Sequence, residues 1–133
     1  KRLLKKFRDS NTIHVLDDIQ DDINKYLNSF YLLITDYSSI WYDFLILDRP
    51  IIYLAPDLDE YVVRDRAHYN EFTDEVVGPI TLSWDETFDE IQKTFIENNN
   101  DWNLLRNNKI SKYYSYIDGN SSKRLMKFIL ENE

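Results

Sequence analysis

Two adjacent serines, Ser38 and Ser39, stand where hydroxyl and backbone N–H groups can meet an anion. They follow a short apolar, β-prone run at 31–35 and precede an almost wholly apolar run at 40–47. The first run is typical of a strand buried on both faces, and the second of a helix packed against a sheet. Unpaired N–H groups at the start of such a helix, together with two hydroxyls, suit a phosphate. A simpler interpretation stays open, in which Ser38 only caps the helix.

Two carboxylates flank the serines. Asp43 comes four positions after Ser39, so helical geometry puts both on one face near the start of the helix. Its carboxylate can accept hydrogen bonds from the ribose hydroxyls of a nucleotide. Alternatively it bonds the serine turn or a tyrosine, because a charge in so apolar a helix requires a partner. Asp36 would repel a diphosphate, so its position favours a role in orienting the turn.

The region from 56 to 77 is the least regular part of the sequence and holds two arginines and one of the two histidines. Ordered loops of this length are more often functional than idle. A guanidinium matches a phosphate, so Arg66 is the predicted diphosphate contact, whereas Arg64 fits an ion pair with a neighbouring acid. His68 is a candidate proton donor or phosphate contact, and His14 reads as a core or edge residue of a strand. Two isolated histidines predict no metal site, although a divalent ion bridging a diphosphate is compatible with the sequence.

Apolar periodicity predicts an α/β domain, with a parallel sheet and helices on both faces. A good capping box opens the helix after Ser83, and Phe88, Ile91 and Phe95 are predicted to face inward. Arg124 is expected to be held either by a carboxylate such as Asp118 or by a ligand phosphate, and Gly119 to take left-handed geometry between the last two helices. The expected strands are 12–16, 31–35, 50–55 and 78–82, and the expected helices are 19–30, 40–47, 84–95, 101–117 and 121–131.

Composition indicates a domain with a substantial core. Hydrophobic residues make up 43% of the chain, and no apolar run is long enough to cross a bilayer. With no cysteine there are no disulfides and no thiolate zinc sites. The net charge of −8 argues against nonspecific nucleic-acid binding and against the domain itself anchoring to an anionic membrane.

Several motifs occur in the order and spacing of one known family. Residues 32–52 read Leu-Leu-Ile-Thr-Asp-Tyr-Ser-Ser, then an aromatic residue, an aspartate, an apolar run and Asp-Arg-Pro-Ile. The downstream motifs are Asp57-Leu58-x-x-Tyr61, Arg66-x-x-Tyr69, Gly78-Pro79 and Asp118-Gly119-x-x-Ser122-x-Arg124. Over about 11–131 the chain resembles the CDP-glycerol glycerophosphotransferase family. Ala67 and Val77 depart from the family's usual glycine and proline.

The resemblance implies a Rossmann-like sheet that is one half of a GT-B architecture, in which two such domains face each other across a cleft. It identifies 1–133 as a single C-terminal, donor-binding domain, and it places the catalytic histidines upstream, so this chain alone is expected to be inactive. The donor-binding residues predicted from the residues and the resemblance together are Ser38, Ser39, Asp36, Asp43, Arg66, Tyr69, Gly78 and Pro79. No metal ligand is predicted.

The function implied by the resemblance is polyol-phosphate transfer from a CDP-activated polyol, such as CDP-glycerol, to a hydroxyl acceptor in a teichoic-acid-like polymer. The implied partners are the donor, a polyol-phosphate or glycolipid acceptor, and the N-terminal half of the same protein. The implied location is cytoplasmic, peripheral on the inner face of the bacterial membrane through the rest of the protein. Two alternatives stay open: a nucleotide-sugar glycosyltransferase on the same scaffold, and a non-catalytic interaction module.

Overall fold

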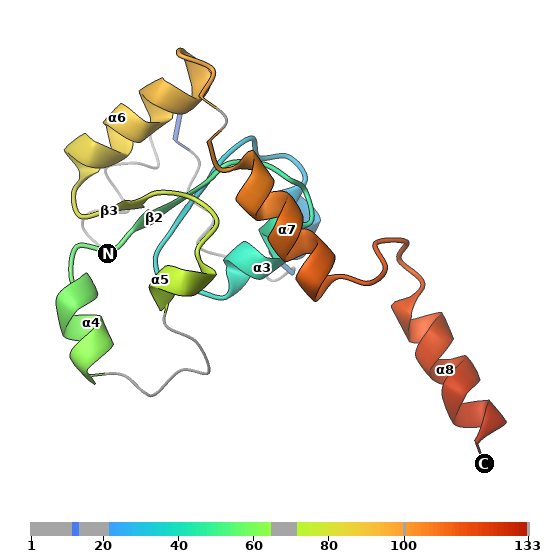
Figure 1. The fold of residues 1–133 in the computed structure, drawn as a ribbon. Helices are drawn as coiled ribbons and strands as arrows, with labels where there is room; N and C mark the ends of the chain where they lie inside the picture. The colour runs from blue at the N-terminus through green and yellow to red at the C-terminus, as the bar shows by residue number, and fades with distance from the viewer. Residues whose placement is uncertain (1–11, 14–21, 65–71, 100, 133) are drawn as a thin grey trace.

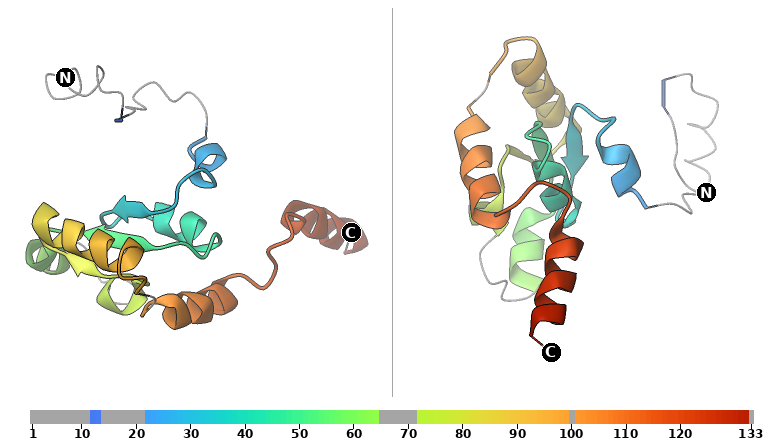
Figure 2. Two further views of the ribbon diagram at one scale, coloured as in Figure 1. Left: turned by 90° about the horizontal axis from the view of Figure 1, so that it is seen from above. Right: turned by 90° about the vertical axis from the view of Figure 1, so that its right-hand side faces the viewer.

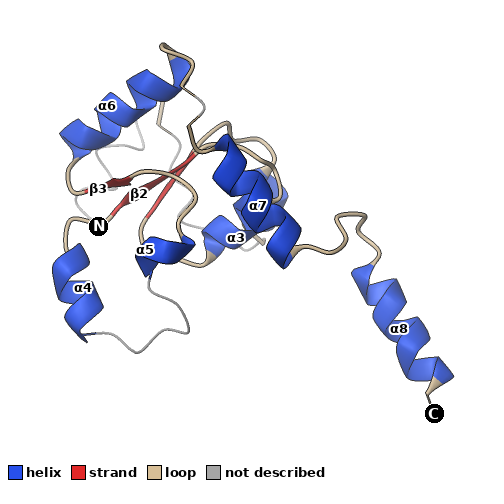
Figure 3. Cartoon of the chain, in the orientation of Figure 1, coloured by secondary structure: helices blue, strands red, loops and turns tan. Residues whose placement is uncertain are grey.

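A computed structural model describes residues 12–13, 22–64, 72–99 and 101–132. Its centre is a three-stranded parallel sheet in the order β1-β2-β3. The strands are β1 (Leu33–Thr35), β2 (Ile51–Leu54) and β3 (Ile80–Thr81). The register places Ile34 beside Ile52, and Tyr53 beside Ile80. This sheet with its flanking helices confirms the predicted α/β, Rossmann-like class (Figures 1 and 3).

The burial that the sequence predicted for residues 31–35 is found in β2 instead. Ile51, Ile52 and Tyr53 are each at most 1% exposed, whereas all three residues of β1 are only half-buried. β1 is the outer strand of the described sheet, so no described strand covers its far edge. Of the strand expected at 12–16, only Thr12 and Ile13 are described and neither is in a strand, while 14–16 lie outside the described residues.

Helices cover both sides of the strands. The helix α3 (Ile40–Leu45) lies on one side with α5 (Phe72–Glu75), and α6 (Trp84–Phe95) lies on the other (Figure 1). Because α3 crosses back over β1, its apolar face fills the core with Trp41, Phe44 and Leu45, each at most 3% exposed. α3 is shorter than the predicted 40–47 and ends two residues earlier.

The helix α7 (Asn103–Tyr113) is held against the α3 and α5 side by buried polar contacts. The Glu75 carboxylate of α5, 8% exposed, pairs with Lys109 Nζ at 2.9 Å and accepts a hydrogen bond from the Tyr113 hydroxyl. The Tyr114 hydroxyl, just past the end of α7, donates to the Tyr42 carbonyl at 2.6 Å. Since a buried carboxylate is costly without partners, these contacts fix where α7 lies.

The region expected to be irregular, 56–77, contains two helices. α4 (Leu58–Arg64) follows β2, and α5 precedes β3. Asp59 and Glu60 lie in the first turn of α4, where acidic side chains interact favourably with unpaired N–H groups. The expectation of a long structureless loop was therefore wrong for the described part of this region.

The inward orientation predicted for three residues of α6 was wrong for Phe88 and Phe95, whereas Ile91 is half-buried. Phe88 and Phe95 are 61% and 50% exposed, and Thr87 faces the sheet instead, fully buried. The Thr87 and Thr81 hydroxyls are hydrogen-bonded at 2.7 Å, and Thr87 Oγ1 also donates to the Ser83 carbonyl at 2.9 Å. Two small, mutually bonded hydroxyls let the helix lie close to β3, which turns the larger aromatic side chains outward.

The capping box of α6 forms, but its glutamate bonds the residue before the N-cap instead of the N-cap itself. Ser83 Oγ accepts from the Glu86 N–H at 3.3 Å, and the Glu86 carboxylate accepts from the Leu82 N–H at 2.7 Å. The expected helix at 19–30 is described only as α2 (Asn24–Leu27), with 19–21 outside the described residues.

The C-terminal helix α8 (Ser121–Glu131) projects away from the rest of the molecule (Figure 2). α7 ends four residues before the predicted 117, and an extended stretch leads to a turn at 118–120. Gly119 has the predicted left-handed geometry, with φ of 69°, but it lies in this turn and not at the end of a helix.

Candidate functional site

The carboxyl ends of β1 and β2 are tied together by one side-chain contact. Tyr37 follows β1 and Asp57 follows β2, and the Tyr37 hydroxyl donates to Asp57 Oδ1 at 3.0 Å. In open parallel sheets, ligands bind outside this carboxyl edge. The contact therefore positions the 36–39 turn at the edge where a ligand is expected.

Aromatic packing further fixes Tyr37. Its ring stacks on Tyr61 of α4, with centroids 3.5 Å apart, and meets the edge of Phe72 of α5 at 5.1 Å. Burial and the hydrogen bond to Asp57 raise the pKa of Tyr37, so the phenol stays a neutral donor. The turn is thus rigidly attached to two helices distant from it in sequence.

Neither serine of the turn acts as a side-chain cap. Ser39 occupies the N-cap position of α3 in αR geometry and makes no side-chain capping bond. The Ser38 backbone N–H donates to Asp36 Oδ1 at 3.0 Å, and no hydrogen bond of its hydroxyl occurs among the described residues. The interpretation in which Ser38 caps the helix was therefore wrong. Both serines are exposed, so both hydroxyls are available to a ligand.

The two carboxylates near the serines have different surroundings. Asp36 accepts the Ser38 N–H and closes the turn, which matches the orienting role that its position favours. Asp43 is exposed on α3, and in the described part of the chain no hydrogen bond to it is present. No hydrogen bond from the turn or from a tyrosine to Asp43 is therefore present in that part. Burial raises the pKa of Tyr114, and the negative charge of Asp43 raises it further.

The helix behind the serines is too short for a strong dipole. α3 has six residues, fewer than two full turns, so few backbone dipoles add along its axis. The attraction for an anion at this turn must come from hydroxyl and N–H hydrogen bonds and from nearby cations.

Arg66, Tyr69 and His68 lie in 65–71, outside the described residues. The residues on either side of this segment are informative. Tyr61, in the helix that precedes it, and Phe72, which directly follows it, both contact Tyr37. Phe72, the first described residue after the segment, therefore lies beside the serine turn, and Tyr61 lies there in the last turn of α4 before the segment begins.

Gly78 and Pro79 lie at the opposite, amino edge of the sheet. A Cβ atom on Gly78 would stand 1.8 Å from the Ile51 carbonyl oxygen, so only glycine fits beside β2. The Pro79 carbonyl accepts from the Tyr53 N–H at 2.9 Å, and Pro79 lines a surface pocket with Thr94 and Trp102. The structure thus does not bring these two predicted residues together with the serines.

Comparison with known proteins gives the family. The model of the CDP-Glycerol:Poly(glycerophosphate) glycerophosphotransferase family matches residues 2–131. The chain belongs to this family. It is 34% identical over 121 residues to a teichoic acid glycerol-phosphate transferase of Staphylococcus aureus, which covers 86% of this chain and 31% of that protein.

Two further relatives are also named as teichoic acid enzymes. A teichoic acid poly(glycerol phosphate) polymerase of Bacillus spizizenii is 31% identical, over 93% of this chain and 28% of that protein. A teichoic acid ribitol-phosphate polymerase of Staphylococcus aureus is 34% identical, over 83% of this chain and 21% of that protein. The chain therefore spans about a third or less of the length of these relatives.

This glycerophosphotransferase-family chain also has site residues that were not among the predicted donor-binding residues. Tyr37, Asp57 and Tyr61 form the support of the turn, with the contacts given above. All three lie inside the family motifs, Asp-Tyr-Ser-Ser and Asp-Leu-x-x-Tyr, which was the available signal. Within the described residues there is no cluster of acids and histidines that could hold a metal ion, and no helix long and apolar enough to cross a membrane.

Proposed function

We propose that this chain is the donor-binding domain of an enzyme that transfers a polyol phosphate from a CDP-activated polyol, such as CDP-glycerol, during synthesis of a teichoic-acid-like polymer. Family membership and relatives named as glycerol-phosphate and ribitol-phosphate transferases support the reaction class. The observation that carries the site is the serine turn: two exposed hydroxyls without capping bonds, at the carboxyl edge of the sheet.

The turn can act as a rigid cradle for the diphosphate. The Ser38 and Ser39 hydroxyls donate to phosphate oxygens, and hydrogen bonds to a charged acceptor are stronger than those to a neutral one. Because Asp36 and the Tyr37–Asp57 contact already fix the turn, little conformational freedom is lost on binding. Donor affinity then depends on the direction in which the two hydroxyls point.

The same edge is acidic, with Asp36, Asp43 and Asp57 near the turn. These carboxylates would repel a diphosphate, so the proposal requires a cation close by. Arg66 is our choice because a guanidinium matches a phosphate, and because Tyr61 and Phe72, on either side of its segment, both contact Tyr37. Asp43, exposed one helical turn after Ser39, is placed to accept from ribose hydroxyls. A divalent ion on the diphosphate is compatible with the proposal and not required by it.

In the proposed reaction, an acceptor hydroxyl attacks the distal phosphorus of the donor and CMP leaves. The base that takes the acceptor proton belongs to the N-terminal half of the same protein, facing this domain across the cleft. The present chain binds and orients the donor and stabilises charge on the departing CMP, mainly by positioning and electrostatics. The acceptor is a polyol phosphate or glycolipid at the inner face of the bacterial membrane.

Ser39→Ala tests the site. Loss of a hydrogen bond to a charged group costs about 1.5–3 kcal/mol, so the Kd for CDP-glycerol should rise roughly tenfold to a hundredfold in calorimetry. Arg66→Ala should weaken binding by a similar factor. Ser29→Ala is the matched control, because Ser29 is an exposed serine before β1, at the amino side of the sheet.

Thermal unfolding of each variant checks that the fold is intact. CDP-glycerol binding by Ser39→Ala equal to that of the parent chain would show that the turn is only structural. Tighter binding of a UDP- or GDP-sugar than of CDP-glycerol would favour the glycosyltransferase alternative. Absence of any nucleotide binding would favour an interaction module.

A further inference from the structure

A surface pocket lies at the amino edge of the sheet, between the end of α6 and the start of α7. It has a wider part of about 240 Å³ and a narrow inner part of about 20 Å³. Pro79, Thr94, Asn99 and Trp102 line both parts, which therefore adjoin, and we call them together the amino-edge pocket. Figure 1 shows the connection from α6 to α7 far from α4, the helix that follows β2 at the carboxyl edge.

Arg106 lines the inner part of the pocket and is 6% exposed. Its Nε donates to Asp48 Oδ1 at 3.1 Å and its Nη2 donates to Asn103 Oδ1, whereas Nη1 makes no hydrogen bond among the described residues. Nη1 is not sealed in the core either, because the Tyr53 hydroxyl is the one described side-chain group that is both buried and unbonded. A space of about 20 Å³ admits one water-sized atom, such as one phosphate oxygen. The inner part therefore offers a charged N–H donor to a single oxygen acceptor.

The start of α7 adds backbone donors. Trp102, its N-cap residue, makes no side-chain capping bond, and the N–H groups of Leu104 and Leu105 make no hydrogen bond among the described residues. N–H groups in a first turn point back along the helix axis, and the dipole of this helix of 11 residues favours an anion there. Arg106 and the helix start therefore suit the same small group, for which a phosphate is the best match.

The wider part of the pocket is lined by groups that suit hydroxyls and a carbon chain. Glu90 Oε1 pairs with Lys93 Nζ at 2.6 Å, and Asp101 Oδ2 accepts from Asn99 Nδ2 at 2.9 Å. The second oxygen of each carboxylate makes no hydrogen bond within the described part of the chain, so each can accept from a hydroxyl. Trp102 is half-buried and offers an apolar ring surface between these groups and Arg106.

Local contacts fix the rim of the pocket. Asn98, with a φ of 55°, ends α6, and the Asn99 N–H donates to the Lys93 carbonyl at 3.1 Å. Asn99 Oδ1 then accepts from the Asp101 N–H at 2.8 Å. A rim that is already bonded loses little conformational freedom when a ligand binds.

The charges of the pocket narrow the class of ligand. Lys93 and Arg106 balance Glu90 and Asp101 in the lining, whereas the whole chain carries −8. An anion therefore meets less repulsion here than over the average surface. A bare anion would leave the two carboxylates without donors, and a neutral polyol would leave Arg106 without a charged acceptor. A ligand with both a phosphate and free hydroxyls satisfies both ends.

We propose that the amino-edge pocket binds one unit of a polyol-phosphate chain. A phosphate oxygen accepts from Arg106 Nη1 and the first N–H groups of α7, the polyol carbons pack on Trp102, and hydroxyls donate to Glu90 and Asp101. The choice of ligand rests on the proposed function, whose product is such a chain. The site goes beyond donor binding, because it lies at the opposite edge of the sheet from the serine turn. A chain held here stays attached to the domain while the donor is replaced.

The test follows the indole N–H signals of the three tryptophans by NMR while a synthetic oligo(glycerol phosphate) is added to the 133-residue chain. We expect the Trp102 signal to shift. The signals of Trp84, 57% exposed at the other end of α6, and of Trp41, 3% exposed in the core, should stay unchanged. Glycerol 3-phosphate distinguishes a free unit from a chain, and it should give the same shift. Inorganic phosphate and glycerol should each bind at least about tenfold more weakly, because each satisfies only one end of the pocket.

Two variants locate the binding, with affinity measured by calorimetry. Arg106→Lys keeps a cation for Asp48 but removes Nη1, so the Kd for the oligomer should rise roughly tenfold to a hundredfold. Trp102→Ala should raise it about tenfold, because the apolar contact with the ring is lost. Thermal unfolding of each variant checks that the fold is intact.

Matched controls make the same changes elsewhere. Arg124→Lys alters an arginine that pairs with Asp118 of its own segment, and Trp84→Ala removes an exposed tryptophan of α6. Both should leave oligomer binding unchanged.

Three results would overturn the proposal: no shift of the Trp102 signal, inorganic phosphate that binds as tightly as the oligomer, or an oligomer affinity that Arg106→Lys and Trp102→Ala leave unchanged. The second result would make the pocket a site for an anion only. Ser39→Ala should not change the Trp102 titration, and Trp102→Ala should not change CDP-glycerol affinity. Failure of this site is therefore distinguishable from failure of the donor site.

Discussion

At the scale of single residues, Tyr37 determines the geometry of the serine turn. Its ring packs against two helices and its hydroxyl donates a hydrogen bond to Asp57. The adjacent serines make no side-chain capping bond, and both are exposed. Such supporting contacts are how a binding turn is preorganised. The polar groups proposed to meet the donor and the residues that hold them in place are thus different residues.

Gly78 carries a prediction at the same scale. In Gly78→Ala the added methyl group would stand 1.8 Å from the Ile51 carbonyl oxygen, so the strands must separate or the chain must shift. We expect a loss of at least about 2 kcal/mol of unfolding free energy, measured by urea denaturation.

Gly119→Ala is the control, because its added methyl group would meet nothing within 4 Å and only the φ of 69° is unfavourable. Its expected cost is about 1 kcal/mol. Equal stability of Gly78→Ala and the parent chain would contradict the close approach of Gly78 to β2.

At the scale of elements, α7 is held by polar contacts as well as by its apolar face. The buried Glu75 joins α5 to α7 through Lys109, and Arg106 of α7, 6% exposed, pairs with Asp48 after α3 at 3.1 Å. Asp48 has a φ of 48°, so this pair also fixes an unusual backbone geometry. These contacts specify where α7 lies, and a purely apolar contact would specify it less sharply.

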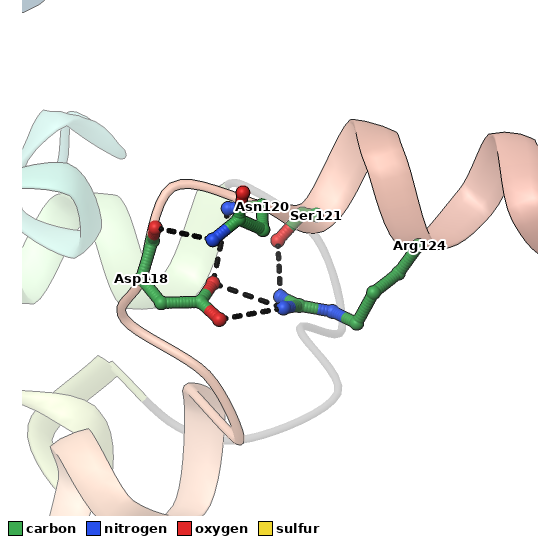
Figure 4. A network of polar contacts seen from close by, with 4 residues as sticks. All are labelled: Asp118, Asn120, Ser121 and Arg124. Carbon is green, nitrogen blue, oxygen red and sulfur yellow. Dashed lines mark hydrogen bonds and ion pairs between the residues drawn. The ribbon is translucent and has the colours of Figure 1, made fainter.

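The ion pair between Asp118 and Arg124 of α8, with 2.9 Å between Oδ2 and Nη1, predicts a pH dependence (Figure 4). The hydrogen bond from the Asn120 N–H, followed by those from Arg124, lowers the pKa of Asp118 below its ordinary value of 3.8. Because the pKa of Asp118 is lower in the folded chain than in the unfolded chain, its contacts stabilise the fold. This stabilisation is fully present above the unfolded-state pKa and is lost as the pH falls through the folded-state pKa.

NMR titration of the Asp118 carboxyl group should therefore show a pKa below 3.8, and Arg124→Gln should move it upward. Lys127→Gln is the control, since Lys127 pairs with Glu131 and not with Asp118. An Asp118 pKa that does not respond to Arg124→Gln would contradict the ion pair.

At the scale of the whole molecule, the net charge bears on how the chain can bind a diphosphate, and the proposed two-domain mechanism bears on whether it can transfer glycerol phosphate. The domain is acidic overall, so a diphosphate must be bound through specific contacts, not by a general positive field. We expect this chain to bind CDP-glycerol without transferring glycerol phosphate, because the proposed base lies in another domain. The assay is release of CMP from CDP-glycerol in the presence of a polyol-phosphate acceptor.

The control for that assay is donor binding by the same preparation, which shows that the domain is folded. CMP release at the rate of a full-length relative would contradict the two-domain mechanism. It would place the catalytic groups among residues of this chain, with His68 the first to test.

The sequence by itself determined the features that depend on near neighbours. The α/β alternation, the Ser83–Glu86 cap, the Asp36 turn and the Arg124–Asp118 pair all link residues at most six apart, or follow from local periodicity. Local spacing fixes such contacts because a turn or a helix has few possible geometries. The family motifs likewise identified the serine turn before any tertiary contact was known.

Only the tertiary structure decided the features that depend on distant residues. The Tyr37–Asp57 bond spans 20 positions, and the Glu75–Lys109 pair spans 34. Periodicity gave α6 an apolar stripe but not its direction, which the Thr81–Thr87 contact set by letting a polar face approach the sheet. Gly78 and Pro79 directly precede β3 of the parallel sheet and so lie at its amino edge, and only the pairing of β3 with β2 places them beside Ile51 and Tyr53.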